Sequence, residues 1–276
     1  MLFVFATLLL VVGCSRLSFI YGFAEGALKD EAAYFLDLND TDEQLVDQKI
    51  NELMSWHNAE MLPRYAKFLN GLADLVAGDR IHRAAISDAK GNLHLLLDKL
   101  VLGAAPHFAD VLVNHTTPEN IRYLEKRMTE RLEERREELS KPVEERLQAR
   151  VERITDNFER LAGNLDNAQV ARIRHYVAQT VDANARWLDT RENRQRAFLN
   201  FLSSQPDRDS IANFLYKIVL RGHEVVDPAY QSLSELRWQL FEILVFDIMT
   251  SLSTKQRRSM TGSLRKYAME ILTLSK

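Results

Sequence analysis

Apolar residues recur every three or four positions along most of the chain, and this spacing limits the fold more than any other feature. Such spacing places apolar side chains on one face of a helix, and no segment keeps the two-residue alternation of a strand for long. With 10 Gly and 6 Pro among 276 residues, few positions break a helix. The sequence therefore predicts an all-α fold. The clearest stripe is Leu233, Leu236, Leu240, Phe241, Leu244, Val245, Ile248, Met249 and Leu252.

Further helical patterns cover nearly all of the remaining chain. No Gly-, Ser- or Pro-rich linker divides them into separate units. Residues 14–276 are therefore predicted to form a single domain, a multi-helix bundle. We expect helices at 22–37, 42–77, 80–86, 88–113, 118–139, 142–162, 167–180, 183–203, 208–224, 229–250 and 254–274.

The segment 118–162 is more highly charged than its surroundings. Between residues 121 and 160 it holds 11 basic and 11 acidic residues, and Ser140-Lys141-Pro142 interrupts it near the middle. Proline suits the first position of a helix, so we expect Pro142 to begin a second helix. The pattern predicts a long charged helical hairpin. It is either a solvated arm held by ion pairs along each helix or a projection that reaches a partner.

Residues 1–13 carry no charge and are mostly apolar. The run is shorter than the roughly 20 apolar residues that a membrane-spanning helix needs, and it fits a signal peptide. It ends in Val11-Val12-Gly13-Cys14, which resembles the lipobox of bacterial lipoproteins, and Cys14 is the only cysteine. That resemblance implies cleavage before Cys14 and a lipid anchor on it. Ser15, where an Asp would signal the inner membrane, implies the outer membrane with the body facing the periplasm.

Composition and missing motifs exclude several classes of function. A formal net charge of −3 gives the chain no overall attraction to nucleic acid. The sequence holds no GxSxG, GxGxxG or phosphate-loop motif. A chain whose only cysteine carries lipid has no thiol left for a zinc site, a disulfide or a nucleophile. We therefore predict no cofactor, no metal site and no catalytic residue.

Short motifs at four expected helix starts share one pattern, a Ser, Thr or Asp followed three residues later by Gln, Asn or Glu. This is the pattern of a capping box, in which two side chains satisfy backbone N–H groups of the first turn. The motifs also resemble the LTxxQ repeats of Spy-type periplasmic chaperones, which bind unfolded clients. They lie at residues 38–44, 116–120, 165–169 and 252–256.

A longer resemblance rests on several motifs in a fixed order. After the lipobox come WHNAEMLPRYA at 56–66, RVER at 150–153, a segment at 159–169 and WLDTRENRQ at 187–195. In this order they resemble a family of uncharacterised proteobacterial lipoproteins, a domain of unknown function with a WHxxELPxYA-like motif. The resemblance implies an all-helical envelope lipoprotein and does not imply any activity.

The motif at 56–66 allows a chemical and a structural interpretation. On a regular helix His57 and Glu60 share a face, with Arg64 one turn further. A carboxylate beside an imidazole suits a proton relay or a ligand groove, although two ligands do not complete a metal site. In the structural interpretation, Pro63 kinks the helix and the neighbouring side chains pack the bend.

The motif at 187–195 also allows a chemical and a structural interpretation. Arg191 lies one turn from Trp187, so its guanidinium could stack on the indole or grip a carboxylate or phosphate. Packing and surface pairing are the structural alternatives. Together the two motifs supply the candidate binding residues, which are Trp56, His57, Glu60, Arg64, Tyr65, Trp187, Arg191 and Arg194.

Three functions are compatible with these features. The favoured one is a non-enzymatic envelope lipoprotein that binds a protein or peptide in a helical groove, as a chaperone-like or assembly factor. A structural scaffold at the outer membrane, contacting peptidoglycan or an envelope complex, is the second. The third is an enzyme acting on cell-wall or lipid material, centred on His57 and Glu60, and it requires His57 to be exposed in a cleft.

Overall fold

The computed structural model describes residues 17–78, 81–181, 183–226 and 228–275, so the predicted signal peptide and Cys14 lie outside the description. Within these ranges the chain is helical and has no strand, which confirms the all-α prediction. No helix there is both long and apolar enough to cross a membrane. The elements are α2 (Leu17–Phe35), α3 (Asp40–Trp56), the π-turn η1 (His57–Met61), α4 (Leu62–Ala77), α5 (Arg83–Leu112), α6 (Pro118–Ser140), α7 (Val143–Ala162), α8 (Asn167–Gln179), α9 (Ala183–Ser203), α10 (Arg208–Leu220), α11 (Gly222–Val225), α12 (Ala229–Ser251) and α13 (Thr254–Leu274).

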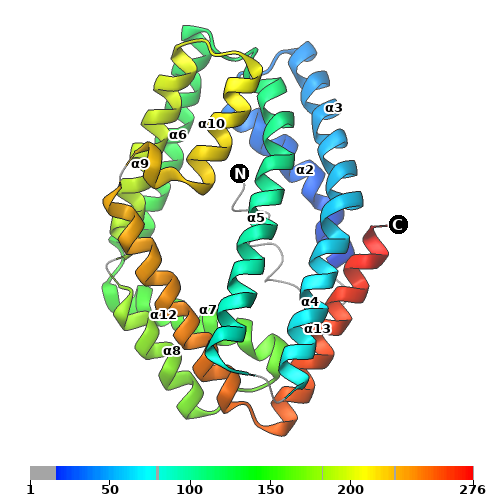
Figure 1. Ribbon diagram of the computed structural model, residues 1–276. Helices are drawn as coiled ribbons and strands as arrows, with labels where there is room; N and C mark the ends of the chain where they lie inside the picture. Colours follow the sequence, from blue (N-terminus) through cyan, green and yellow to red (C-terminus); the bar gives the residue numbers. More distant parts are fainter. Residues whose placement is uncertain (1–16, 79–80, 182, 227, 276) are drawn as a thin grey trace.

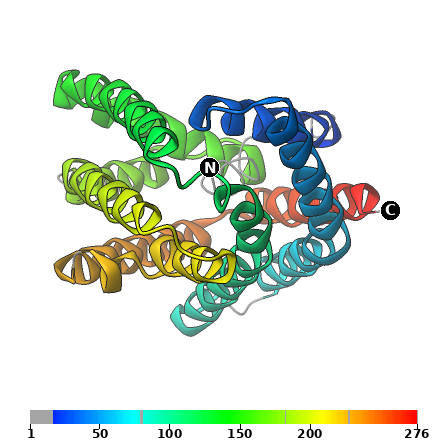
Figure 2. The ribbon, with the colours of Figure 1, turned by 90° about the horizontal axis from the view of Figure 1, so that it is seen from above.

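Helix α5 runs down the middle of the view in Figure 1, from the upper part of the molecule to the lower part. Its 30 residues span about 45 Å at 1.5 Å per residue. In the upper part of the view, α2 and α3 lie on one side of α5, and α6, α9 and α10 lie on the other. In the lower part, α4 and α13 lie together on one side, and α8 and α12 on the other. Seen from above, the helices form a ring (Figure 2).

Among the described residues, buried apolar side chains form one cluster at the lower end, two around the upper part of α5, and one at the junction of α4, α5 and α13. The lower cluster joins α4, α7, α8, α12 and α13, and its Ile173, Ile248 and Met260 are fully buried. One upper cluster joins α2, α3 and α5, and the other joins α5, α6, α9 and α10. The upper part is thus built from two apolar walls that both rest on α5.

Besides shifts of up to five residues at helix ends, two predicted helix spans differ from the structure. The expected break between 80–86 and 88–113 is wrong, because α5 is continuous from Arg83 to Leu112. Ile86 is buried in the core and Gly91 is tolerated within the helix, so the tertiary contacts outweigh the weak local signal. The expected helix at 208–224 is interrupted at Arg221 (φ −125°, ψ 36°), which separates α10 from α11.

The charged segment does contain two helices with a bend at Lys141 and Pro142, but the predicted hairpin is wrong as an arrangement. Helices α6 and α7 do not fold back on each other: α6 packs against α9 and α2, and α7 packs against α8 and α13. Each has its own buried stripe, which includes Leu132 in α6 and Phe158 in α7. The charges therefore cover the outer faces of two helices of the main body.

The repeated helix-start motifs act as caps. Asp166 with Gln169 and Ser253 with Gln256 form complete capping boxes, and the Thr117 side chain accepts from the backbone N–H of Asn120. The cap of α3 differs from the expected one, because its N-cap is Asn39 and its box partner is Asp42. The capping interpretation is confirmed for the last three motifs and shifted by a few residues in the first.

Two of these caps also bind each other. Nε2 of Gln256 donates to Oε1 of Gln169 over 2.9 Å, and Nε2 of Gln169 lies 3.2 Å from the backbone oxygen of Ser251. Gln169 is fully buried. The repeated glutamines therefore join the start of α8 to the start of α13. Their position three residues after each N-cap thus has a structural explanation.

Candidate functional site

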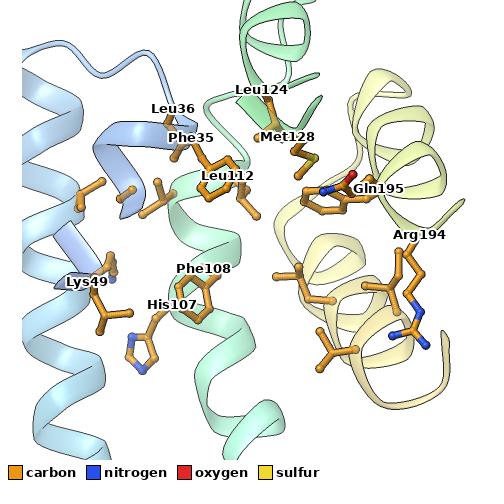
Figure 3. A pocket seen from close by; sticks show the side chains of 18 of the residues that line it. Phe35, Leu36, Lys49, His107, Phe108, Leu112, Leu124, Met128, Arg194 and Gln195 are labelled. Atoms are coloured by element: carbon orange, nitrogen blue, oxygen red, sulfur yellow. The ribbon is translucent and has the colours of Figure 1, made fainter. Parts of the chain in front are cut away.

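A cavity of about 350 Å³ lies between α2, α3, α5, α6, α9 and α10 (Figure 3). Its volume falls within the roughly 300–1,000 Å³ typical of small-molecule sites. The walls are mainly apolar, and Figure 3 shows Phe35, Phe108, Leu112 and Met128 around the open space. Helices α2, α3 and α5 form one wall, and α9 and α10 form the opposite one.

Helix α9 presents a polar face to this apolar space. Thr190, Arg191, Arg194, Gln195 and Phe198 all line the cavity. Positions 190, 194 and 198 are four residues apart, as are 191 and 195, so they lie on one side of a helix. In Figure 3 the Gln195 amide extends into the cavity. A polar side chain on the inner face of a helix costs free energy unless it has a hydrogen-bond partner. These residues therefore identify the part of the wall where polar interactions are made.

At the α3 side, Lys49 and His107 line the cavity within a network of paired charges. Nζ of Lys49 lies 2.9 Å from Oε2 of Glu52 and 3.1 Å from Oδ2 of Asp110. The guanidinium of Arg208 donates to the other oxygen of Asp110 over 2.7 Å. Burial is the main cause that lowers the pKa of His107, so the imidazole is neutral at neutral pH. This end of the cavity is balanced in charge.

At the α6 side, Arg191 lines the cavity in a half-buried position. Burial, followed by the like charges of Arg135 and Arg131, lowers the pKa of Arg191, whereas Glu31 acts in the opposite direction. Arg131 lies 3.3 Å from Glu31 and 4.5 Å above the ring centroid of Tyr34. Glu134 lies 3.5 Å from Nε of Arg131 as well, so two carboxylates offset the charge of that guanidinium.

Arg194 also lines the cavity, but its guanidinium turns away from the centre (Figure 3). It lies against Gly222 of α11, so closely that a Cβ atom there would collide with it. Gly222 is buried, and the short helix α11 follows the break at Arg221. Because glycine has no side chain, position 222 leaves room for the guanidinium of Arg194.

The motif at 56–66 folds as a π-turn between α3 and α4. The backbone N–H of Leu62 donates to the carbonyl of His57, five residues earlier, and Pro63 occupies the start of α4. Proline supplies no N–H and its ring conflicts with the carbonyl four residues before it, so a widened turn accommodates it. The predicted irregularity at Pro63 is confirmed and takes the form of a π-turn.

His57 is buried, with 3% of its surface exposed. Nδ1 lies 3.0 Å from the hydroxyl of Tyr21, which itself donates to Oδ1 of Asn58. The imidazole stacks on the Tyr21 ring, with centroids 5.8 Å apart, and meets Tyr65 at 5.6 Å. Burial lowers the pKa of His57 to about 4 and raises that of Tyr21 to about 12. Both groups are neutral parts of the packing.

Glu60 does not join His57. The π-turn changes the angular spacing of the residues, so positions 57 and 60 no longer share a face. Glu60 is exposed and pairs with Arg64 over 3.1 Å at the surface. The expected His57–Glu60 pair is therefore wrong, and His57 is absent from the residues that line the cavity. Tyr65 is buried beside His57.

Trp56 packs on the backbone of α5. Its indole lies directly against Gly103, where any Cβ atom would overlap the ring. It contributes to both the α2–α3–α5 cluster and a cluster built on Met61, Leu62 and Leu100. Trp56 thus joins the π-turn to the central helix, which agrees with the structural interpretation of this motif.

The two sequence motifs do not converge on one site. Arg191 and Arg194 line the cavity, whereas the residues 56–65 hold the junction of α3, α4 and α5, and the side chain of Trp187 lies outside the description. Within the described residues, no three His, Cys, Asp or Glu side chains gather as metal ligands. Sequence reasoning missed Lys49, His107, Thr190 and Gln195. The four-residue spacing of polar side chains on α9 was the available signal.

The chain matches the model of a known protein family. A family model described as a family of unknown function (DUF6279) matches residues 34–220, which is more than half of the chain. No curated protein matches, and no solved structure matches. The matched segment includes the π-turn and most of the cavity-lining residues.

Proposed function

The chain belongs to this family of unknown function, and we propose that it is a non-enzymatic binding protein that takes an apolar ligand into the cavity. The observation that carries the proposal is the cavity itself. It is large enough for a small ligand, mainly apolar, and bordered by a few polar groups that can orient what enters.

Filling the cavity tests this proposal. Ala32 of α2 is buried and lines the cavity, whereas its neighbour Ala33 is exposed on the same helix. We expect Ala32→Phe to weaken binding of the neutral dye Nile red by at least about tenfold, because the new ring occupies the space. Dye fluorescence titrations on purified protein measure the effect.

Ala33→Phe is the matched control, and we expect it to bind the dye as the unmodified chain does. Wild-type protein that does not bind the dye, or an Ala32→Phe variant that binds it unchanged, would contradict the proposal. Circular dichroism of both variants separates lost binding from lost folding.

We further propose that the protein is a lipoprotein, anchored by Cys14 to the outer membrane and facing the periplasm. Support comes from the apolar run before Cys14, the lipobox-like tetrapeptide and the absence of any other cysteine. Cys14→Ala is expected to abolish palmitate labelling and to release the protein from the membrane fraction. Unchanged labelling and fractionation would exclude the anchor.

The other functions expected from the sequence have less support. The LTxxQ-like motifs that suggested a chaperone act as caps, so binding of a protein or peptide partner stays a prediction, tested by competition with the dye. The charged segment, which also suggested a protein partner, belongs to the main body as α6 and α7. The scaffold role at the outer membrane stays a prediction. The enzyme required His57 to be exposed beside Glu60, and neither condition holds.

A further inference from the structure

Helix α13 has a basic outer face that ends in exposed apolar residues. Its exposed residues recur every three or four positions, so they lie on one side of the helix. Glu270 is the only acidic residue of α13, and it is half-buried. Met269 is 63% exposed. The charged and large apolar members of this face, in chain order, are Lys255, Arg258, Arg265, Lys266, Met269 and Leu272.

The neighbouring helix α4 leaves this balance of charge positive. Arg265 pairs with the exposed Asp74 over 3.1 Å, which offsets one charge of the outer face. Within the η1–α4 segment, Glu60 pairs with Arg64, and Lys67 adds an exposed basic residue. The outer surface of α4 and α13 therefore carries more positive than negative charge.

Helix α7 also contacts α13, near its own last turn. The hydroxyl groups of Ser259 and Ser263 donate to the carbonyl of Leu161 over 3.3 and 3.1 Å. In that turn of α7, Glu159 and Arg160 have opposite charges. The excess of positive charge is therefore a property of α13 itself.

The start of α2 lies beside the apolar end of this face. Tyr21 packs in the same cluster as Ile271 and Leu274, and Figure 1 shows α2 beginning next to the end of α13. Leu17, the first residue of α2, follows Cys14 by three positions, which span at most about 11 Å. A lipid on Cys14 would therefore hold the apolar end of α13 close to the bilayer.

We propose that the outer face of α13 docks on the surface of an anionic phospholipid bilayer, with Met269 and Leu272 at the acyl boundary and the basic residues against the head groups. The inference rests on the proposed anchor at Cys14 and adds the orientation of the body on the membrane. Basic residues beside a bilayer are attracted to its acidic lipids. A lipidated residue and a basic patch are two signals that together give stable attachment.

A fluorescent probe on this face tests the docking. Cys14 is the only cysteine of the chain, so Met269→Cys supplies the one thiol that an NBD dye can label when Cys14 is acylated. The labelled lipoprotein is reconstituted in vesicles of phosphatidylcholine, alone or mixed with an equal part of phosphatidylglycerol. We expect NBD fluorescence at least about twofold higher in the mixed vesicles, because the probe leaves water for the interface.

Leu236→Cys is the matched control for the probe. Leu236 is an apolar residue of α12 that is 50% exposed, and α12 begins on the opposite side of the molecule from the end of α13 (Figures 1 and 2). Its probe is expected to report water in both kinds of vesicle. Salt at about 1 M, where the screening length falls to about 3 Å, should remove the difference between the vesicles at position 269.

Charge reversal assigns the attraction to α13. In the Met269→Cys chain, Arg258→Glu is expected to lower the fluorescence difference between the two kinds of vesicle at least about twofold. Arg174→Glu is the matched control, because Arg174 is an exposed arginine of α8, on the other side of the lower part of the molecule. The comparison of vesicles without charge reversal stands even if Arg258→Glu does not fold.

The outcomes separate the surface from the anchor. If the dye labels the unmodified chain at Cys14, that thiol carries no lipid, and both the anchor and the docking are wrong. If Cys14 is blocked and the probe at position 269 reports water in both kinds of vesicle, the anchor stands and the docking is wrong, so a protein or peptidoglycan becomes the candidate for this face. An equal rise in neutral and mixed vesicles would exclude the preference for anionic lipid.

Discussion

Gly103→Ala is expected to destabilise the folded protein by about 2 kcal/mol, although alanine is the better helix former. The indole of Trp56 occupies the position that a Cβ atom at residue 103 would take. Both partners are rigid, since Gly103 lies in the middle of α5 and Trp56 is held between two apolar clusters. Relief therefore requires α3 and α5 to move apart. Urea unfolding curves, fitted for the free energy of unfolding, measure the loss of stability.

Gly91 provides the matched control on the same helix. It is exposed, and nothing lies within 4 Å of a Cβ atom built there. Gly91→Ala is expected to stabilise the protein by roughly 0.5–1 kcal/mol through helix propensity alone. Trp56→Phe in the Gly103→Ala background should recover part of the loss, because the smaller ring leaves room for the methyl group. Equal stability of the two alanine variants would show that the close packing is absent in solution.

Acid is expected to weaken the fold through His57 by about 3 kcal/mol between pH 6.5 and pH 4. Burial lowers the pKa of His57 from 6.5 to about 4 in the folded state. As the pH falls below 6.5, the unfolded chain takes up the proton first, so protonation favours unfolding. The stabilisation by neutral His57 is complete above pH 6.5 and is lost as the pH approaches 4.

His57→Gln should remove this part of the pH dependence, because glutamine is polar and does not titrate. The variant is expected to be less stable at neutral pH and to lose less stability between pH 7 and pH 4. Unfolding curves at several pH values measure the difference in slope. The matched control is His175→Gln, which replaces an exposed histidine of α8. A parallel pH profile for His57→Gln and the unmodified protein would disprove the assignment.

The helices were predictable because each buries one stripe with a regular spacing. In α12 the predicted stripe includes Leu244, Ile248 and Leu252, which are all buried, whereas its outer member Leu236 is exposed. The arrangement of the helices was harder to predict from the sequence. The charges of α6 and α7 suggested a free arm, but sequence periodicity does not tell which neighbour covers a stripe.

The site was harder to predict than the fold. Leu28, Ile50 and Leu53 line a cavity, yet in sequence they look like ordinary core residues of α2 and α3. Whether apolar side chains meet or leave space depends on how six helices are arranged. The π-turn at His57 is equally hidden, because one widened turn changes which residues share a face and leaves the overall helical pattern intact.

The pairing of α4 with α13 bears on the order in which the chain can fold. Asp74 and Arg265, which contact each other across this interface, are 191 positions apart. Helix α4 is synthesised early, and the part of its apolar face that α13 covers stays uncovered until nearly the whole chain exists. Contacts between such distant segments form late, because the loop between them must first close. Loss of α13 would therefore open the centre of the lower core rather than trim an end of the molecule.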